Sequence, residues 1–522
     1  MNKIYTGSIL FLLFFLASFQ NNNLAQAPGT LDAQFGTGGS TQVAFLTFQS
    51  DCKAMAIQND GKIILAGQYI GGGKGNMGFV RLNADGTPDN TFGTNGSVSV
   101  PFDNTNVSVV SVQVLPNGQI IAGGNSDGLV TILRMLANGT VDNSFGVNGV
   151  VQFSGDLNAL TDLIILPGGK LAGCGVADQG NGKLFAAFRR NADGTADNTF
   201  GTNGFAYVNV GTQPSVTRMK AQTDGKLLLT GTVYVNNSTW YELVLLRFNT
   251  DGTPDAGFGT AGKVLWFFAN NGGYELGNDL AIQPDGKIVV AGRIANSGPT
   301  VFTVVRFNAN GTKDNLFGTN GAIKFNFYTS VDEAKALTIQ PDGKILVAGT
   351  ALNGSNRERA IARLTQPGAR DASFATGGNT VTAIGTKAIG EAVALQPNGK
   401  IVVAGGATLS NLSRFSVARY HSGLVVSAPE LPAGIESLSA FPNPARRGEP
   451  VVLRLELREN LNAQVQLNSL DGRLARDFGS FDLSAGAQEL RLETPPDLPS
   501  GQYMLLITTD RGRKALPLMV RD

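Results

Sequence analysis

The 522-residue chain is poor in the side chains on which most metal and nucleophile chemistry depends, with one histidine, His421, and two cysteines, Cys52 and Cys174. A three-histidine zinc centre and a Cys/His zinc cluster are therefore excluded, and a Ser-His-Asp triad could use only His421. Charged residues make up 16% of the chain and the formal net charge is +1, which argues against nucleic-acid binding because that function needs a basic surface. Two cysteines are too few for a disulfide framework, so we expect two isolated, buried thiols.

Long apolar runs are also missing, with one short exception near the N-terminus. A lysine precedes the apolar run Ile9 to Phe19, and the small residues Ala25 and Ala27 follow it. The run is shorter than the ~20 residues of a membrane-spanning helix, and this order is typical of a secretory signal peptide. We expect residues 1–27 to be such a peptide, cleaved after either alanine, and the mature chain to be exported and soluble; an uncleaved anchor is the alternative.

Glycine is abundant, with 67 residues, and it marks an internal repeat. A turn of the type Pro-Asp-Gly-Lys recurs with its glycine at Gly61, Gly118, Gly169, Gly225, Gly286, Gly343 and Gly399. An Asp-x-x-Phe-Gly motif recurs with its phenylalanine at Phe35, Phe92, Phe145, Phe200, Phe258, Phe317 and Phe374. An arginine closes an apolar run at Arg81, Arg134, Arg189, Arg247, Arg306, Arg363 and Arg419. Three marks that each occur seven times indicate a tandem repeat of about 56 residues.

Each repeat predicts four short strands. Apolar residues alternate on both sides of the Pro-Asp-Gly turn in 336–350, and further alternating runs such as 302–307 and 322–327 follow in the repeat. Four strands without any helical period are typical of one propeller blade. After the expected signal peptide, residues 30–36 contain the Asp-x-x-Phe-Gly motif that ends a repeat, and the last repeat lacks this motif. The N-terminal strand is therefore expected to complete the last blade. The prediction is an all-β fold: a seven-bladed β-propeller over residues 28–423.

These repeats resemble the delta-60 repeat family, whose consensus contains Gln-Pro-Asp-Gly-Lys-Ile-x-Val-Ala-Gly and Asp-x-x-Phe-Gly-x-x-Gly. Residues 283–292 and 255–259 match it closely, and the resemblance covers about 390 residues. It implies a propeller-like extracellular protein and no settled activity.

The last part of the chain has a different composition. A linker at 424–436, rich in serine, proline and glutamate, precedes alternating runs that predict a small antiparallel β-sandwich at 437–522. Its marks resemble the C-terminal sorting domain of the type IX (Por) secretion system, a resemblance that rests on Pro442, Asn443, Pro444, Gly472, Arg473, Gly501 and Tyr503. It implies export by the type IX secretion machinery to the cell surface or the medium. An ordinary immunoglobulin-like accessory domain is the alternative.

Features shared by all repeats are most simply scaffold, so the repeated aspartates and arginines are expected to pair with one another. One turn, with Asn83, Asp85 and Asp89, spaces its oxygens as in a calcium loop. Asn and Asp also stabilise turns by bonding to their own backbone, and the full EF-hand pattern is absent. Calcium is therefore only an alternative here, and no other cofactor is expected.

Segments that differ between repeats are the better candidates for a ligand site. Two of them carry aromatic residues beside Asn and Glu, the pattern of a sugar or peptide site, namely Tyr234, Trp240, Tyr241, Tyr274 and Glu275. Packing between blades is the alternative for these aromatics and for Trp266. Acidic residues also recur before the first strands, at Asp51, Asp162, Asp279, Glu333 and Glu391, where a solvated rim is expected and a cation site or a glycosidase acid and base are alternatives.

We therefore expect a secreted or cell-surface propeller that acts as a binding or structural module for an extracellular glycan or protein, without catalysis and without nucleic acid. The alternative is a polysaccharide-active hydrolase or lyase that uses carboxylates on the face of variable loops.

Overall fold

The computed structural model describes residues 26–44, 49–102, 106–154, 157–180, 182–234, 241–266, 274–295, 298–328, 331–424, 434–469, 474–509 and 512–521. Two compact units divide the chain, and the boundary lies after Gly423 apart from three residues at 397–399. No helix in these ranges is long and apolar enough to cross a membrane.

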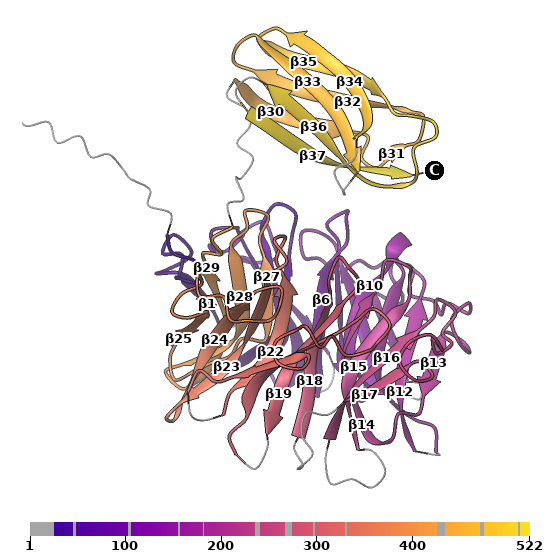
Figure 1. Ribbon diagram of the computed structural model, residues 1–522, viewed down its shortest axis with the longest axis vertical. Coiled ribbons are helices and arrows are strands. Elements are labelled where there is room, and N and C mark those ends of the chain that lie inside the picture. Colours follow the sequence, from indigo (N-terminus) through magenta and orange to yellow (C-terminus); the bar gives the residue numbers. More distant parts are fainter. Residues whose placement is uncertain are drawn as a thin grey trace, which may run out of the picture. The chain divides into compact units, whose positions relative to one another are not determined.

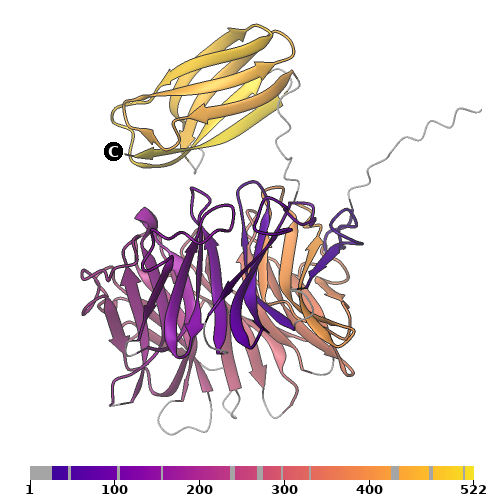
Figure 2. The same ribbon diagram turned by 180° about the vertical axis from the view of Figure 1, so that it is seen from behind.

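The first unit consists of antiparallel strands that recur in sets of four (Figure 1; Figure 2). In chain order the sets with their bounds are β2 (Ser50–Ile57), β3 (Ile63–Gly71), β4 (Lys74–Leu82) and β5 (Ser97–Pro101); β6 (Val107–Val114), β7 (Ile120–Ser126), β8 (Leu129–Met135) and β9 (Val150–Phe153); and β10 (Leu157–Ile165), β11 (Leu171–Asp178), β12 (Lys183–Arg190) and β13 (Phe205–Val208). There follow β14 (Thr212–Ala221), β15 (Leu227–Tyr234), β16 (Tyr241–Phe248) and β17 (Lys263–Trp266); β18 (Tyr274–Ile282), β19 (Ile288–Ala295), β20 (Val301–Phe307) and β21 (Ala322–Phe325); and β22 (Glu333–Ile339), β23 (Ile345–Asn353), β24 (Asn356–Leu364) and β25 (Asn379–Thr382). The last set contains β26 (Lys387–Ala388), β27 (Ala392–Leu395), β28 (Ile401–Leu409), β29 (Leu412–Tyr420) and, from the N-terminus, β1 (Ser40–Val43).

The turn chemistry explains the first hairpin of each set. In the turn before β19, Gly286 has φ +81°, which a glycine adopts without strain, and the Oδ1 of Asp285 accepts a hydrogen bond from the N–H of Lys287 at 3.1 Å. One turn contains the short 3-10 helix Pro167–Gly169. The predicted hairpins around these turns are therefore confirmed.

A β-bulge interrupts the first strand in six of the seven sets, a feature that the sequence did not reveal. The register shifts lie at Cys52/Ala54, Val109/Ser111, Leu160/Asp162, Val216/Arg218, Gly277/Asp279 and Ala334/Ala336. These first strands contact one another in chain order, and β27 contacts β2. A bulge re-aims the side chains beside it, so the residues after the shifts line a common axis.

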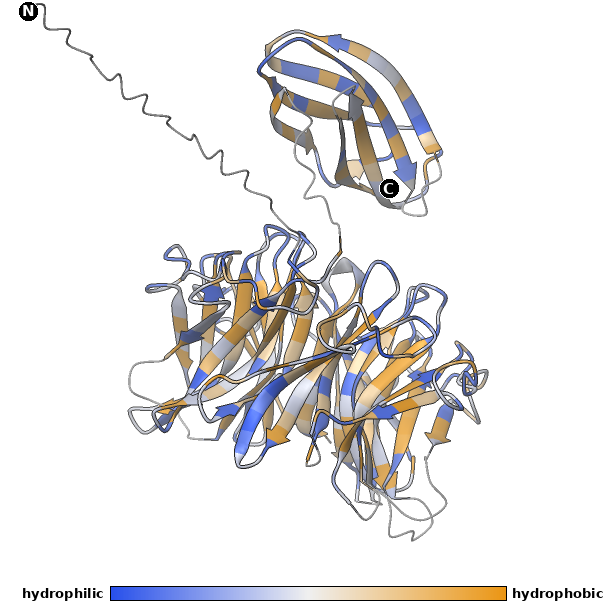
Figure 3. Ribbon diagram, turned by 60° about the vertical axis from the view of Figure 1, so that its left-hand side comes forward, coloured by the Kyte–Doolittle hydropathy of each residue, from blue (hydrophilic) through white to orange (hydrophobic). Residues whose placement is uncertain are grey.

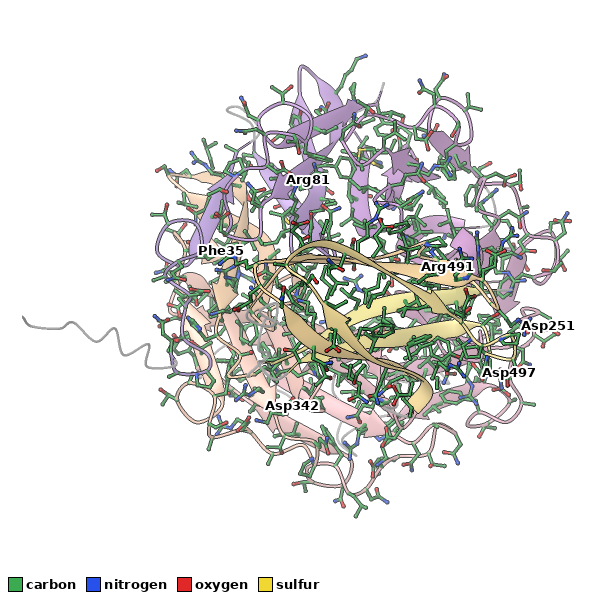
Figure 4. The ribbon with its side chains drawn as sticks, turned by 90° about the horizontal axis from the view of Figure 1, so that it is seen from above. Phe35, Arg81, Asp251, Asp342, Arg491 and Asp497 are labelled. Atoms are coloured by element: carbon green, nitrogen blue, oxygen red, sulfur yellow. The ribbon has the colours of Figure 1, made fainter. Side chains whose placement is uncertain are left out.

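The repeated arginine and aspartate form an ion pair in each repeat, as predicted, and the guanidinium lies over the ring of the repeated phenylalanine; we call this group of three side chains a tie. The Arg81 Nε donates to Asp89 Oδ2 at 2.7 Å, and the guanidinium carbon lies 4.7 Å from the ring centre of Phe92. The equivalent ion pairs are Arg134–Asp142, Arg189–Asp197, Arg247–Asp255, Arg306–Asp314, Arg363–Asp371 and Arg419–Asp32. Arg81 also donates to the carbonyl of Ala137 in the next set, so the tie joins neighbouring sheets. Figure 4 labels Arg81 and the equivalent phenylalanine of the last set, Phe35.

The N-terminal segment pairs with the last strands of the same unit. β1 runs antiparallel to β29, with Ser40 opposite Ala418, and the backbone N–H of Asp32 donates to the carbonyl of Arg419 at 2.9 Å. The hydrogen bonds that join the N-terminal segment to β29 therefore connect residues almost four hundred positions apart in the chain.

The second unit is an antiparallel sandwich, apart from one short parallel pair. One sheet has the order β30 (Ile435–Phe441), β32 (Pro450–Leu457) and β35 (Gly486–Glu493), and the other has the order β31 (Ala445–Arg446), β37 (Gly512–Arg521), β36 (Gly501–Thr509), β33 (Leu461–Ser469) and β34 (Leu474–Leu483). Apolar and polar bands alternate along these strands in Figure 3. Every second residue of β32, from Val451 to Leu457, lies in the core, as the two-residue period of a strand requires.

Candidate functional site

The tyrosines predicted from the variable segments meet at one end of β15 and β16. Tyr234 lies opposite Tyr241 in the sheet, and the ring centres are 4.0 Å apart. A single parallel bridge joins Tyr241 to Tyr274. Trp240 lies outside the described residues, and only the backbone of Tyr274 and Glu275 is described. The structure thus brings three of these positions together but does not test their role as a ligand site.

The position of Trp266 bears on the packing alternative. Trp266 is half-buried, and its ring meets that of Phe307 edge-on at 6.1 Å. It packs against the apolar cluster between two neighbouring sheets, which is the packing alternative.

The turn with calcium-like spacing is held by protein donors. The Oδ1 of Asp85 accepts hydrogen bonds from the N–H and the hydroxyl of Thr87, at 3.0 and 2.7 Å. Asn83 donates through Nδ2 to Thr87 Oγ1, and the Asp89 carboxylate belongs to the tie described above. Burial alone would raise the pKa of Asp89, but hydrogen bonds from Thr91 and Lys62 hold it well below its usual range. Calcium binding at this turn stays a prediction.

The described sorting-motif residues gather on one sheet of the second unit. The Oδ1 of Asn443 accepts the backbone N–H of Met519 in β37 at 2.9 Å, and the residues after Pro444 form β31, which pairs with the same strand. Gly501 begins β36, where Tyr503 donates its hydroxyl to the carbonyl of Pro499 at 2.8 Å. Gly472 and Arg473 lie outside the described residues.

A polar concave site of the first unit lies where its first strands meet. A cavity of about 420 Å³ is lined by residues of β2, β6, β10, β14, β18, β22 and β27. Its charged lining residues are Lys53, Arg218, Lys220, Asp162, Asp279 and Glu391. We call this space the axial pocket.

Two aspartates of the axial pocket act as clamps between neighbouring sheets. Asp162 accepts the N–H of Leu163 at 2.9 Å and that of Met219, in the next set, at 3.0 Å. Asp279 repeats the arrangement, with Leu280 at 2.8 Å and Leu337 at 2.9 Å. The oxygens of both carboxylates are therefore already engaged by the scaffold.

Arg218 lies close enough to the carboxylates of Asp162 and Asp279 to interact with both electrostatically. Its Nε is 4.0 Å from the Oδ1 of Asp279, and the charges of Asp162 and Asp279 raise its pKa although burial alone would lower it. Burial raises the pKa of Asp162 despite the nearby Arg218 and Lys220. Arg218 uses one N–H for the carbonyl of Thr217 at 3.2 Å. The side chain of Lys220 makes no hydrogen bond or ion pair with any residue that the structure describes.

A second group of charges forms a chain beside these residues. Lys53 Nζ lies 3.3 Å from Glu391 Oε1, and Lys335 bridges from Glu391, at 3.9 Å, to Glu333, at 3.3 Å. Burial alone would lower the pKa of Lys53, but Glu391 and Asp51 raise it. Lys53 and Lys335 therefore stay charged and are paired with carboxylates. In the axial pocket, the side chain of Lys220 has no such partner, and Arg218 keeps N–H groups that no described residue accepts.

The acids of this site were predicted, but as parts of a solvated rim. Asp162 and Asp279 are instead buried. Both lie seven residues before the turn glycine of their repeat. The cations Lys53, Arg218, Lys220 and Lys335 were missed. They lie within two residues of a first-strand bulge, at three different positions of the repeat.

A family model described as a domain of unknown function, DUF5122 beta-propeller, matches residues 58–92, 115–145, 222–258, 283–317, 340–374 and 396–423. The chain is a β-propeller repeat protein. No curated protein sequence matches it. Among solved structures it is similar to polysaccharide lyase Uly1 (12% identity, TM-score 0.43, 76% of this chain and 94% of that chain). It is also similar to Sqt1 from Chaetomium thermophilum (12%, TM-score 0.40, 90% and 96%) and to a protein from Lactobacillus plantarum (13%, TM-score 0.37, 63% and 86%).

Proposed function

We propose that the first unit is a seven-bladed propeller, closed by its N-terminal segment, and that it is a binding module without catalysis. The cyclic contacts of the first strands, from β2 through β27 and back to β2, support the blade count. The pairing of β1 with β29 and the Asp32–Arg419 ion pair support the closure.

The ligand that the axial pocket fits best carries an anionic group, such as the carboxylate of an acidic extracellular glycan. The observation that carries this proposal is an imbalance of hydrogen-bonding capacity. The pocket's aspartates already accept backbone N–H groups, whereas Lys220 and Arg218 retain unused donors. Charge-assisted bonds to carboxylates or sulfates use such donors.

A glycan array that contains uronate-bearing, sulfated and neutral oligosaccharides tests the proposal. We expect binding to the acidic members alone, weakened about tenfold or more by Lys220→Met, because a hydrogen bond to a charged group contributes about 1.5–3 kcal/mol. Lys183→Met, which removes an exposed lysine on β12, is the matched control and should bind normally. Binding of neutral glycans alone, or equal binding by the Lys220 variant, would refute the role of the axial pocket.

The polysaccharide hydrolase or lyase remains the second candidate because of Asp162. Burial raises its pKa, which is what a general acid in glycoside cleavage requires. Release of shortened products from array-positive glycans, abolished by Asp162→Asn, would favour the enzyme over the binding module.

The proposal also includes export of the protein. Residues 1–27 act as the secretory signal peptide, and residues 437–522 of the second unit are recognised by the type IX secretion machinery. The ordered contacts of Asn443 and Tyr503 in one sheet support this reading. Removing 437–522 should leave a folded propeller in the periplasm, measured by fractionation. Surface delivery of the truncated chain would overturn the assignment.

A further inference from the structure

One interface between neighbouring sheets contains an arginine where the other repeats have an apolar side chain. The residue four positions before the repeat arginine is Met77, Val130, Phe185, Leu243, Phe302, Arg359 and Phe415 in chain order. These apolar side chains insert against a glycine or its neighbours in the next sheet. A Cβ built on Gly231 would lie 2.8 Å from Phe185, and one on Gly67 would lie 2.7 Å from Phe415.

Arg359 is fully buried in its slot and has no carboxylate partner among the residues that the structure describes. Its Nε donates to the carbonyl of Ile389 and its Nη2 to that of Ser416, both at 3.3 Å. Its Nη1 has no hydrogen-bond partner among the described residues. An isolated buried charge is very costly, and buried donors are almost always satisfied. The slot therefore lacks a negative charge.

Two hydroxyl groups without partners flank the same slot. Thr350 lies directly opposite Arg359 in β23 and β24, and Ser416 lies directly opposite Gly405 in β28 and β29; directly opposite residues share a face of the sheet. The Oγ1 of Thr350 and the Oγ of Ser416 are buried and make no hydrogen bond in the described part of the chain. Because Arg359 reaches the Ser416 carbonyl, both hydroxyls border the interface that holds the guanidinium.

Two ionisable groups of the described chain lie within electrostatic reach of Arg359, Tyr420 and Cys52, and neither neutralises it. Burial raises the pKa of Tyr420 above its ordinary value and that of the Cys52 thiol to about 12, so neither group carries a charge at neutral pH. We propose that a small monovalent anion of the chloride class occupies this slot, bound by Arg359 Nη1 and the hydroxyls of Thr350 and Ser416. It would act as a structural ion between two sheets and is independent of the axial pocket.

The test uses the whole chain and halide salts as probes. Crystals grown with sodium bromide should give an anomalous peak within hydrogen-bonding distance of Arg359 Nη1. Melting in chloride rather than gluconate, at constant ionic strength, should raise Tm saturably, by about 3 °C at a hundred times the dissociation constant. An ordered water without a bromide peak, or equal Tm values in both salts, would overturn the proposal.

Arg359→Met should remove both signals, because Met77 fills the equivalent slot of another sheet. Arg357→Met, on the same strand but only half-buried, is the control and should keep them. If Arg359→Met fails to fold, the bromide peak and the salt dependence of Tm in the natural chain still test whether an anion binds beside Arg359. Halide dependence that persists in a folded Arg359→Met protein would place the ion elsewhere and refute the assignment.

Discussion

Removal of the Asp32 carboxylate tests whether the N-terminal segment holds the propeller together. Asp32 is 2% exposed and lies 2.9 Å from Arg419 and 3.2 Å from Lys400. Asp32→Ala leaves two cations without their shared anion, and breaking a buried pair from one side costs about 3–5 kcal/mol. With a melting entropy of about 2.1 cal/mol/K per residue, the unit of about 400 residues has about 0.8 kcal/mol/K. The variant should therefore melt about 4–6 °C lower.

The matched control is Asp142→Ala, which breaks the equivalent tie inside a continuous stretch of chain. There Gln119 replaces the lysine of the other repeats, and it donates to Asp142 at 2.7 Å. Only the cation of Arg134 loses its partner, so calorimetry should show a smaller decrease in Tm. If Asp32→Ala changed Tm by less than Asp142→Ala, the N-terminal seam would not contribute to closure as argued.

Two further predictions concern protonation and thiol reactivity. The tie aspartates Asp89, Asp197 and Asp371 have pKa values held well below the usual range by hydrogen bonds from hydroxyls and lysines, against the effect of burial. Carboxylates with depressed folded pKa values stabilise the fold above their unfolded pKa and lose that contribution as pH falls through the folded pKa. Tm should therefore be nearly constant from pH 7 to about pH 4 and fall steeply below it; a steep loss already at pH 6 would contradict this reasoning. Cys52 and Cys174 are free and buried, and burial raises the pKa of Cys52 to about 12, so mass spectrometry should find neither alkylated by iodoacetamide at pH 8 until guanidinium is added. Rapid labelling of the native protein would show that these interfaces open.

Much of the scaffold could be predicted because the same turn and charge motifs occur in seven repeats, so the secondary structure did not have to be inferred from a single segment. The Pro-Asp-Gly turns predicted the first hairpins, and the seven arginines and aspartates predicted the ties, since a charge repeated in every unit is buried only with a partner. The burial of Cys52 and Cys174 was expected because two cysteines are too few for a disulfide framework, and both are free and buried.

The axial pocket could not be predicted because it depends on register. A shift of one residue moves a side chain to the other face of a strand, and the bulges at Leu160/Asp162 and Val216/Arg218 have no sequence signature of their own. The aromatic segments attracted attention because they vary visibly. The charges at the axis are single residues close to the bulge of a first strand, at positions that differ between repeats, which is a weaker signal.

Comparison of the repeats also shows which positions of this chain can carry a charge that the other repeats lack. Each tie arginine is anchored by an aspartate, which comes from its own repeat in six ties and from the N-terminal segment in the seventh, so replacing one member is costly. The positions near the bulge and in the inter-sheet slot lie outside the ties, and a single substitution there changes the local charge without disturbing them. Arg218 and Arg359 are both of this kind. One faces a solvent-accessible axis and has acids beside it; the other faces a closed interface and has none. Arg218 lies on a first strand, β14, and Arg359 on a third strand, β24. The difference in surroundings decides that Arg218 is available to a ligand from solution, whereas Arg359 requires an ion that is built into the fold.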